Sequence, residues 1–363
     1  MASNHAPQRT PFYAAHRALG ATMTEFAGWE MPLQYSGVVA EHLAVRRAVG
    51  VFDISHMGVL LVAGPNAQVV LNALLTNDVA QLQSGHAQYT FICNERGGVV
   101  DDLILYRIEP SMFLLVVNAI NMEKDFNWIA AHATQPVVLE NRTTQTAALA
   151  LQGPAAARVL PEAAGLSRFQ IARFTLAGCT GWTARTGYTG EDGFELFFDV
   201  ADAEKVWREL LERGKPFGLV PAGLGARDSL RLEMCYPLYG HELDENTTPV
   251  EAGLSQFVAF DKGPFIGQPA LLQQRKNGVS RRLIAFAMDY KGPLPRMQCK
   301  IFAGGQPVGT VTSGSYSPML DVGIGLGYAE PAVAAIGTQI QVEIRGRLYP
   351  AKVKPRPLVK KHK

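Results

Sequence analysis

The sequence predicts an α+β protein built from two related split β-α-β (ferredoxin-like) units and a C-terminal antiparallel β-barrel. An internal repeat predicts the two units: the pattern Gly-Pro-x-Ala-x-x-Val-Leu occurs at residues 64–71 and 153–160, each time after an apolar strand and at the start of a helix. A second strand-and-helix pair follows each pattern at a similar distance, at residues 113–124 and 194–205. The loss of helical periodicity toward the C-terminus predicts the barrel.

The remaining elements follow in chain order. Residues 22–36 contain a glycine- and proline-bounded loop, and residues 38–48 have the apolar spacing of a helix that ends before Gly50. A strand begins at Val51. In each repeated unit the second helix has one apolar stripe, so two helices cover one small sheet. This arrangement favours split β-α-β units over a doubly wound parallel sheet, and no glycine-rich nucleotide-binding motif follows any strand.

The chain is expected to divide into two regions. Residues 1–278 contain the repeated units, at about 50–140 and 141–215 with flanking segments, and residues 279–363 contain the barrel, formed by 281–355.

Composition excludes several function classes. The apolar content of 47% is that of a globular protein, and a net charge of +2 gives no general attraction to nucleic acid. No apolar run is long enough to span a membrane, and the first residues lack a signal or transit sequence. The four cysteines form no C-x-x-C pair, which predicts reduced thiols in the cytoplasm and no zinc site. No metal is expected.

Two adjacent carboxylates, Asp101 and Asp102, interrupt an apolar strand after the Gly97-Gly98 turn. A break in the apolar pattern of a strand indicates a functional site. Because side chains alternate along a strand, the two carboxylates must face opposite sides. The structural alternative is that both carboxylates lie at the start of the strand, where one forms a hydrogen bond in the turn and the other is in solvent.

Two further features have functional and structural interpretations. Arg227 and Arg231 lie one helical turn apart, which suits either a fork that grips a carboxylate or an exposed pair. His56 has no second histidine at ligand spacing, so it is expected to be packed or hydrogen-bonded and not to ligate a metal.

Several motifs together resemble one family, the aminomethyltransferases (T-proteins) of the glycine cleavage system, in the order that this family shows. The motifs are Phe26-Ala27-Gly28-Trp29-Glu30-Met31-Pro32, Phe52-Asp53-Ile54-Ser55-His56-Met57-Gly58, Gly97-Gly98-Val99-Val100-Asp101-Asp102-Leu103, Thr186-Gly187-Tyr188-Thr189-Gly190-Glu191-Asp192-Gly193-Phe194-Glu195, Gly225-Ala226-Arg227-Asp228-Ser229-Leu230-Arg231-Leu232-Glu233, Leu238-Tyr239-Gly240-His241-Glu242-Leu243-Asp244-Glu245 and Thr310-Val311-Thr312-Ser313-Gly314-Ser315-Tyr316-Ser317-Pro318.

The resemblance implies three lobes around a central folate pocket and a defined reaction. In that reaction the one-carbon unit of an aminomethyl group on the lipoyl arm of the H-protein passes to tetrahydrofolate. The products are 5,10-methylenetetrahydrofolate, ammonia and the dihydrolipoyl H-protein. Lipoylated H-protein is thus the implied partner, with the other glycine cleavage components acting indirectly and tetrahydrofolate as co-substrate. The protein's task is to orient a carbon-carrying cofactor and to place charge beside its reactive nitrogens.

The resemblance also assigns residues. Asp102 matches the catalytic carboxylate that faces the folate nitrogens, while Asp101 points away. The positions that match folate contacts or the lining of the pocket are Glu195, Arg227, Tyr188, Tyr89, Asn118 and Met57. The sequence departs from the family near its end, where Lys354-Pro355-Arg356-Pro357 lacks the usual aromatic residue.

The residues leave two alternatives open. One is a folate-dependent demethylase of a small methylated donor, because the folate-binding part of its site would be similar to that of the transferase. The other is a folate-binding protein without transferase activity that assists iron–sulfur enzymes, since Cys235-Tyr236 is similar to part of that group's signature. For the transferase, we expect the carrier to dock on a rim of the cavity, and a basic rim at Arg281-Arg282 or the basic tail 354–363 would speed the encounter if the carrier is acidic.

Overall fold

The structure is a computed structural model that describes residues 6–360 of the 363-residue chain. Two compact units divide these residues. Unit 1 consists of the described residues up to Val70, Ala80–Gln88 and Leu103–Asp228, and unit 2 consists of Leu71–Val79, Tyr89–Asp102 and the described residues from Ser229 onward. The domain boundary expected after Gly278 stays a prediction.

Unit 1 begins with a three-stranded sheet in the order β1-β3-β2 and two helices. The helix α2 starts where the Glu41 carboxylate accepts the backbone N–H groups of Tyr35, Ser36 and Gly37, which have no partner within the helix. These elements are β1 (Gln8–Arg9), α1 (Tyr13–Ala18), β2 (Thr22–Phe26), β3 (Trp29–Gln34) and α2 (Val38–Arg47).

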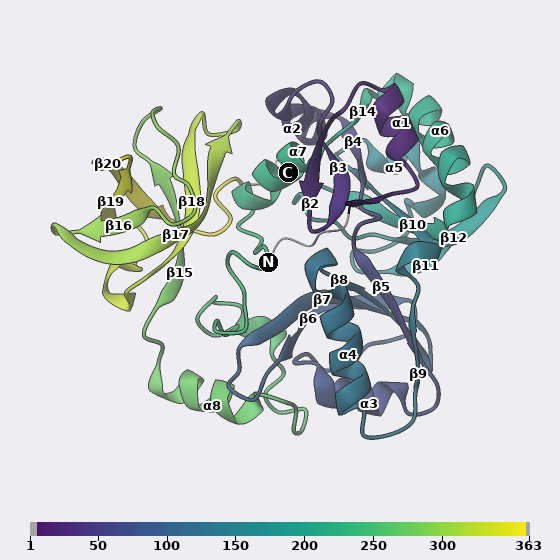
Figure 1. Ribbon diagram of the computed structural model, residues 1–363, viewed down its shortest axis with the longest axis horizontal. Helices are drawn as coiled ribbons and strands as arrows, with labels where there is room; N and C mark the ends of the chain where they lie inside the picture. The colour runs from purple at the N-terminus through teal and green to yellow at the C-terminus, as the bar shows by residue number, and fades with distance from the viewer. Residues whose placement is uncertain (1–5, 361–363) are drawn as a thin grey trace. The chain divides into compact units, whose positions relative to one another are not determined.

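A six-stranded sheet in the order β11-β12-β13-β10-β4-β14 follows in unit 1 (Figure 1). Its apolar face packs on α5 and α6, where Val206, Trp207 and Leu210 join the strand residues in one core. Such burial is the main stabilising contribution of a layered α+β fold. The elements are β4 (Val49–Asp53), β10 (Thr146–Gln152), α5 (Ala156–Val159), β11 (Ile171–Leu176), β12 (Cys179–Ala184), β13 (Gly193–Asp199), α6 (Ala203–Gly214) and β14 (Leu219–Pro221).

A five-stranded sheet has the order β6-β7-β8-β5-β9. It repeats the same sequence of elements, namely strand, helix, three strands, helix and strand, so the repeat is confirmed. Each split β-α-β unit is extended by one strand, because three strands and not two separate its helices. The elements are β5 (Gly58–Ala63), α3 (Ala67–Leu74), β6 (His86–Cys93), β7 (Val99–Glu109), β8 (Met112–Val117), α4 (Met122–His132) and β9 (Val138–Asn141).

The C-terminal part of unit 2 is a closed six-stranded barrel, as expected (Figure 1). Glycines on β18 make its packing possible: a Cβ on Gly325 would lie 2.4 Å from the Phe286 ring inside the barrel. The barrel strands are β15 (Arg282–Met288), β16 (Lys300–Ala303), β17 (Gln306–Ser317), β18 (Val322–Ala329), β19 (Gln339–Ile344) and β20 (Arg347–Lys354).

Two longer helices and seven short 3₁₀ turns complete the described residues. None of the helices among residues 6–360 is long and apolar enough to cross a membrane. The helices are α7 (Leu224–Glu233) and α8 (Gln268–Asn277), and the turns are η1 (Ala119–Asn121), η2 (Thr143–Gln145), η3 (Pro161–Ala163), η4 (Val200–Asp202), η5 (Lys215–Phe217), η6 (Ser255–Phe257) and η7 (Pro331–Val333).

Candidate functional site

The carboxylate of Glu195 is the centre of a polar cluster in unit 1. Glu195 lies on β13, where its strand partners are Ala150 and Ala184, and these small side chains leave room beside it. Thr186 Oγ1 and Tyr106 Oη both donate hydrogen bonds to Glu195 Oε2, at 2.5 and 3.1 Å. Because both bonds end on Oε2, the other oxygen is available to accept N–H groups from a ligand.

A cation lies in the same cluster. The Arg227 guanidinium, at the start of α7, lies 4.8 Å from the centroid of the Tyr188 ring. Burial lowers the pKa of Arg227, while the nearby Tyr188 and Glu195 act in the opposite direction. Stacked on the ring, the guanidinium keeps N–H donors that suit a ligand carboxylate.

His56 lies close to this cation. Its buried ring packs edge-on against Phe26, with ring centroids 5.6 Å apart. Burial, together with the Arg227 charge, lowers the pKa of His56 to about 4, although Asp53 opposes the shift. His56 is therefore a neutral, packed histidine at neutral pH, which confirms that part of the sequence interpretation. Among residues 6–360, no group of three or more His, Cys, Asp or Glu side chains has the arrangement of a metal site.

Met57 and Asn118 lie together at one end of the five-stranded sheet. The antiparallel ladder of β5 and β8 ends with Gly58 opposite Val117, and these two residues come directly before and after that pair. Both side chains are half-buried.

The predicted carboxylate pair lies in unit 2, at the start of β7. Asp101 is fully buried, whereas Asp102 is half-buried and accepts a 2.7 Å hydrogen bond from Tyr89 Oη. The Tyr89 ring is itself held edge-on by Phe91 and Phe257. Asp102 is thus the member of the pair with access to solvent, and its carboxylate orientation is fixed by a tyrosine.

The turn before these carboxylates is fixed by close packing within unit 2. Asn94 Oδ1 accepts the N–H groups of Arg96 and Gly98, both at 3.0 Å, and Asn94 Nδ2 donates to the Glu245 carbonyl at 2.9 Å. A Cβ on Gly98 would lie only 1.9 Å from that carbonyl oxygen. Glycine is required at position 98 because its backbone lies directly against the backbone carbonyl of Glu245.

Arg227 and Arg231 do not form the paired carboxylate-binding site that the sequence suggested. Arg231 is buried in unit 2, where it pairs with Glu242 at 2.9 Å and donates to Ser313 Oγ at 2.9 Å. An arginine whose guanidinium is used in this way has a structural role. The exposed-pair alternative is also wrong, because Arg231 is buried and Arg227 is half-buried.

Sequence reasoning missed Tyr106 and Thr186, the two hydroxyl donors to Glu195. Tyr106 ends an apolar strand segment and has the pattern of a core residue. Burial, followed by the charge of Glu195, raises the pKa of Tyr106 and keeps the phenol protonated. Thr186 opens the motif that also contains Tyr188 and Glu195, so its place in that motif was the available signal.

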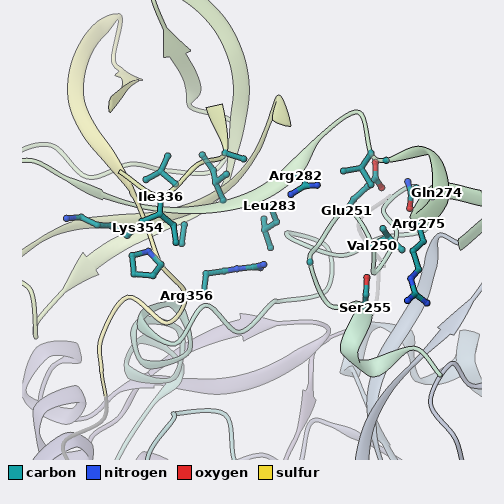
Figure 2. A pocket seen from close by; sticks show the side chains of 18 residues that line it. Val250, Glu251, Ser255, Gln274, Arg275, Arg282, Leu283, Ile336, Lys354 and Arg356 are labelled. Atoms are coloured by element: carbon teal, nitrogen blue, oxygen red, sulfur yellow. The ribbon is translucent and has the colours of Figure 1, made fainter. Parts of the chain in front are cut away.

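A second polar region lies in unit 2, where a cavity of about 390 Å³ is lined by four cationic side chains. Figure 2 shows Arg282, Lys354 and Arg356 on its barrel side and Arg275 at the end of α8. The one carboxylate in the lining, that of Glu251, is already hydrogen-bonded within the protein. It accepts from Arg281 Nε at 3.1 Å and from the backbone N–H of Thr248 at 2.9 Å. The cavity therefore has an excess of positive charge.

Comparisons with known proteins give matches over nearly the whole chain. Residues 12–262 match the GCVT N-terminal domain, and residues 281–360 match the glycine cleavage T-protein C-terminal barrel domain. The chain is 47% identical over 362 residues to an aminomethyltransferase of Shouchella clausii, covering 98% of both. It is 46% identical over 363 residues to one of Geobacillus thermodenitrificans, covering 98% of this chain and 99% of the relative.

A solved structure is also similar. The crystal structure of glycine cleavage system aminomethyltransferase T from Bartonella henselae matches with a TM-score of 0.91 at 36% identity, covering 98% of each chain. The chain therefore belongs to the aminomethyltransferase family, the T-proteins of the glycine cleavage system.

Proposed function

We propose that this aminomethyltransferase passes the one-carbon unit of an aminomethyl group on lipoylated H-protein to tetrahydrofolate. The products are 5,10-methylenetetrahydrofolate, ammonia and dihydrolipoyl H-protein. The observation that carries the proposal is the half-buried cluster of Glu195, Arg227 and Tyr188, in which an acceptor oxygen and a stacked cation lie in one unit.

The side chains of this cluster fit two chemically different groups of a folate. A pterin ring offers N–H donors, which suit the Glu195 oxygen that no described hydrogen bond uses. A carboxylate or ring carbonyl of the ligand suits Arg227, whose planar guanidinium can donate parallel hydrogen bonds. Tyr188, Asn118, Met57 and Tyr89 are proposed as further folate contacts, at the positions that the family resemblance assigns.

Asp102 is proposed as the catalytic residue. Tetrahydrofolate, when bound, supplies the nitrogens that accept the carbon. Positive charge develops there during transfer, and an ionised carboxylate fixed beside it stabilises that charge without reorganising. The hydrogen bond from Tyr89 holds Asp102 in one orientation, which supports a role in positioning and electrostatics over one in proton transfer.

The carrier is proposed to dock on the basic surface of unit 2. Of the two arginines expected there, Arg282 lines the cationic cavity, whereas Arg281 is held by Glu251. Lys354 and Arg356 of the basic tail also line that cavity, while residues 361–363 of the tail lie outside the described residues. An excess of positive charge would speed the encounter with an acidic carrier.

The reaction itself tests the function. The protein is incubated with tetrahydrofolate and aminomethylated H-protein, and methylenetetrahydrofolate and ammonia are measured. We expect both products, with neither formed when the carrier or the folate is omitted. Turnover of a small methylated donor in place of the carrier would favour the demethylase. Folate binding without turnover of either donor would favour the non-transferring protein.

A further inference from the structure

The side chain of Gln152 lies inside a loop of the unit 1 site. Gln152 is the last residue of β10, opposite Gly193 on β13 and Gly50 on β4, and it is 1% exposed. Its Nε2 donates to the Thr186 carbonyl at 3.0 Å, and its Oε1 accepts from Thr189 Oγ1 at 2.8 Å. Both ends of one buried amide therefore bind residues 186–191, which we call the 186–191 loop.

Two glycines, Gly187 in the loop and Gly193 at the start of β13, show how closely this amide is surrounded. A Cβ on Gly187 would lie 2.0 Å from Gln152 Oε1, and a Cβ on Gly193 would lie 2.6 Å from its Nε2. No other residue fits at either position with Gln152 in place. The amide is thus part of the loop's interior and not a side chain that happens to lie beside it.

A buried arginine binds the same loop from another element. Arg46, in the last turn of α2, donates from one nitrogen to the Thr189 carbonyl and to Glu191 Oε1, both at 2.7 Å. The two side chains of this ion pair are 4% and 19% exposed, so little solvent screens it. Removal of one partner would leave a buried charge, which makes this attachment costly to break.

The base of the loop is closed by a third interaction. Arg185 donates from Nε and one terminal nitrogen to the two carboxylate oxygens of Asp192, at 2.8 and 2.6 Å. The loop is therefore held at its base, in its interior and from α2. Its two functional contacts are the Thr186 hydroxyl on Glu195 and the Tyr188 ring under Arg227.

We propose that Gln152 and Arg46 are positioning residues that hold the 186–191 loop in the conformation that orients both folate-binding side chains. The proposal rests on the assignment of Glu195 and Arg227 to the folate. A glutamine is needed because the loop presents a carbonyl at Thr186 and a hydroxyl at Thr189, so the side chain must donate at one end and accept at the other. Gln152→Glu has the same size but presents an acceptor to the Thr186 carbonyl.

The test compares Thr189→Val with Thr189→Ser. Valine keeps the shape of threonine but removes the hydroxyl, which donates to Gln152 and accepts the Glu191 N–H, whereas serine keeps both bonds. Gln152→Glu changes only the glutamine side of this contact. We expect Thr189→Val and Gln152→Glu to raise KM for tetrahydrofolate by roughly 5- to 30-fold, the effect of one buried hydrogen bond, with kcat changed less than about threefold. Thr189→Ser should restore KM to near the parent value.

Hydrogen exchange provides a readout that general destabilisation would not move selectively. In Thr189→Val, amides of the 186–191 loop should exchange faster while those of β10 and β13 keep their protection. Unchanged KM in Thr189→Val, with or without faster exchange, overturns the proposal. The same KM increase in Thr189→Ser also overturns it, because the hydroxyl would then not be responsible.

Glu195→Gln separates the positioning role of Gln152 from folate binding itself. If Glu195→Gln weakens folate binding while Thr189→Val does not, the assignment of the folate site is supported and the positioning role is rejected. If Glu195→Gln leaves folate binding unchanged, the assignment of the site falls whatever the loop does.

Discussion

At the scale of the residue, the candidate site contains two charged groups, each with part of its surface left for a ligand. Two hydroxyls bind one oxygen of Glu195, and an aromatic ring covers one face of Arg227. Neither group is neutralised by a close ion pair in the described part of the chain. Both keep part of their hydrogen-bonding capacity for a ligand, which is the preorganisation expected of a binding site.

Substitution of these two residues tests their binding roles. Arg227→Ala and Glu195→Gln should each weaken tetrahydrofolate binding, by ~2–5 kcal/mol for the arginine, since a buried ligand carboxylate would lose its partner. Arg227→Lys keeps the charge but loses the planar fork, so we expect an intermediate loss. Titration calorimetry measures all three. An affinity for tetrahydrofolate like that of the parent in Arg227→Ala would show that Arg227 does not contribute to folate binding.

His56 gives a pH dependence with a defined sign. Its pKa is about 4 in the folded protein and about 6.5 when unfolded, so the unfolded state binds more protons between these values. The stabilisation from the neutral ring is complete above about pH 6.5 and is lost as the pH falls toward 4. From these pKa values, about 2 kcal/mol is lost between about pH 7.5 and about pH 5.

Urea unfolding at both pH values measures that loss. His56→Asn should be less stable than the parent at about pH 7.5, because packing is lost, but its stability should fall by about 2 kcal/mol less on acidification. An equal pH dependence in both proteins would show that the His56 proton is not the cause.

At the scale of the element, turns position the side chains of the candidate site. The turn before β7 is closed by Asn94 and by the backbone at Glu245, so the strand starts at a fixed residue and presents Asp102, not Asp101, to solvent. A shift of one residue would exchange the two carboxylates, because side chains alternate along a strand. The same principle applies to the 186–191 loop, whose shape is fixed by an amide inside it.

Gly98→Ala tests how tightly this turn is packed. The added Cβ would lie 1.9 Å from a backbone oxygen, which cannot move without displacing the segment at Glu245. We expect a loss of about 3 kcal/mol or more in the free energy of unfolding, measured by urea denaturation. Gly165→Ala is the control, since nothing lies within 4 Å of its added Cβ, and its effect should stay within about 0.5 kcal/mol. Similar stability of the two variants would refute this account of the turn.

At the scale of the whole molecule, net charge is nearly balanced at +2, yet cations gather around one cavity of unit 2. Screening by salt acts on such a surface at long range but hardly on a half-buried ion contact. The carrier and the folate should therefore differ in their response to ionic strength.

The salt dependence of the two Michaelis constants tests carrier docking. Between roughly 50 and roughly 300 mM salt, KM for H-protein should rise steeply while KM for tetrahydrofolate changes little. Arg282→Glu should raise KM for H-protein at low salt, whereas Arg347→Glu, exposed on the barrel but outside the cavity lining, should not. Equal effects of the two substitutions on KM for H-protein would show that the carrier does not dock at the cavity.

Much of this architecture could be predicted because it repeats. Two copies of one pattern predicted two small sheets with two helices each, and alternating short strands predicted the barrel. The third strand between the helices was missed, because short apolar strands joined by brief turns give no signal of how many pair. The roles of Tyr106, Thr186 and Gln152 were missed for another reason. Tyr106 and Gln152 bond to residues 80 and 34 positions away in the chain, and Tyr106 lies on a different sheet from Glu195, so only the fold brings these side chains together.

Transfer is proposed to depend on the charge of Asp102. The decisive measurement is methylenetetrahydrofolate formation by Asp102→Asn, with tetrahydrofolate binding measured on the same sample. Asparagine keeps size and hydrogen bonding but removes the charge, so folate should still bind while kcat falls by ~10²–10⁴. Asp101→Asn, at the fully buried neighbour, should mainly lower the free energy of unfolding. Parent-like turnover in Asp102→Asn would contradict the account, and loss of turnover only in Asp101→Asn would assign the catalytic role to the other carboxylate.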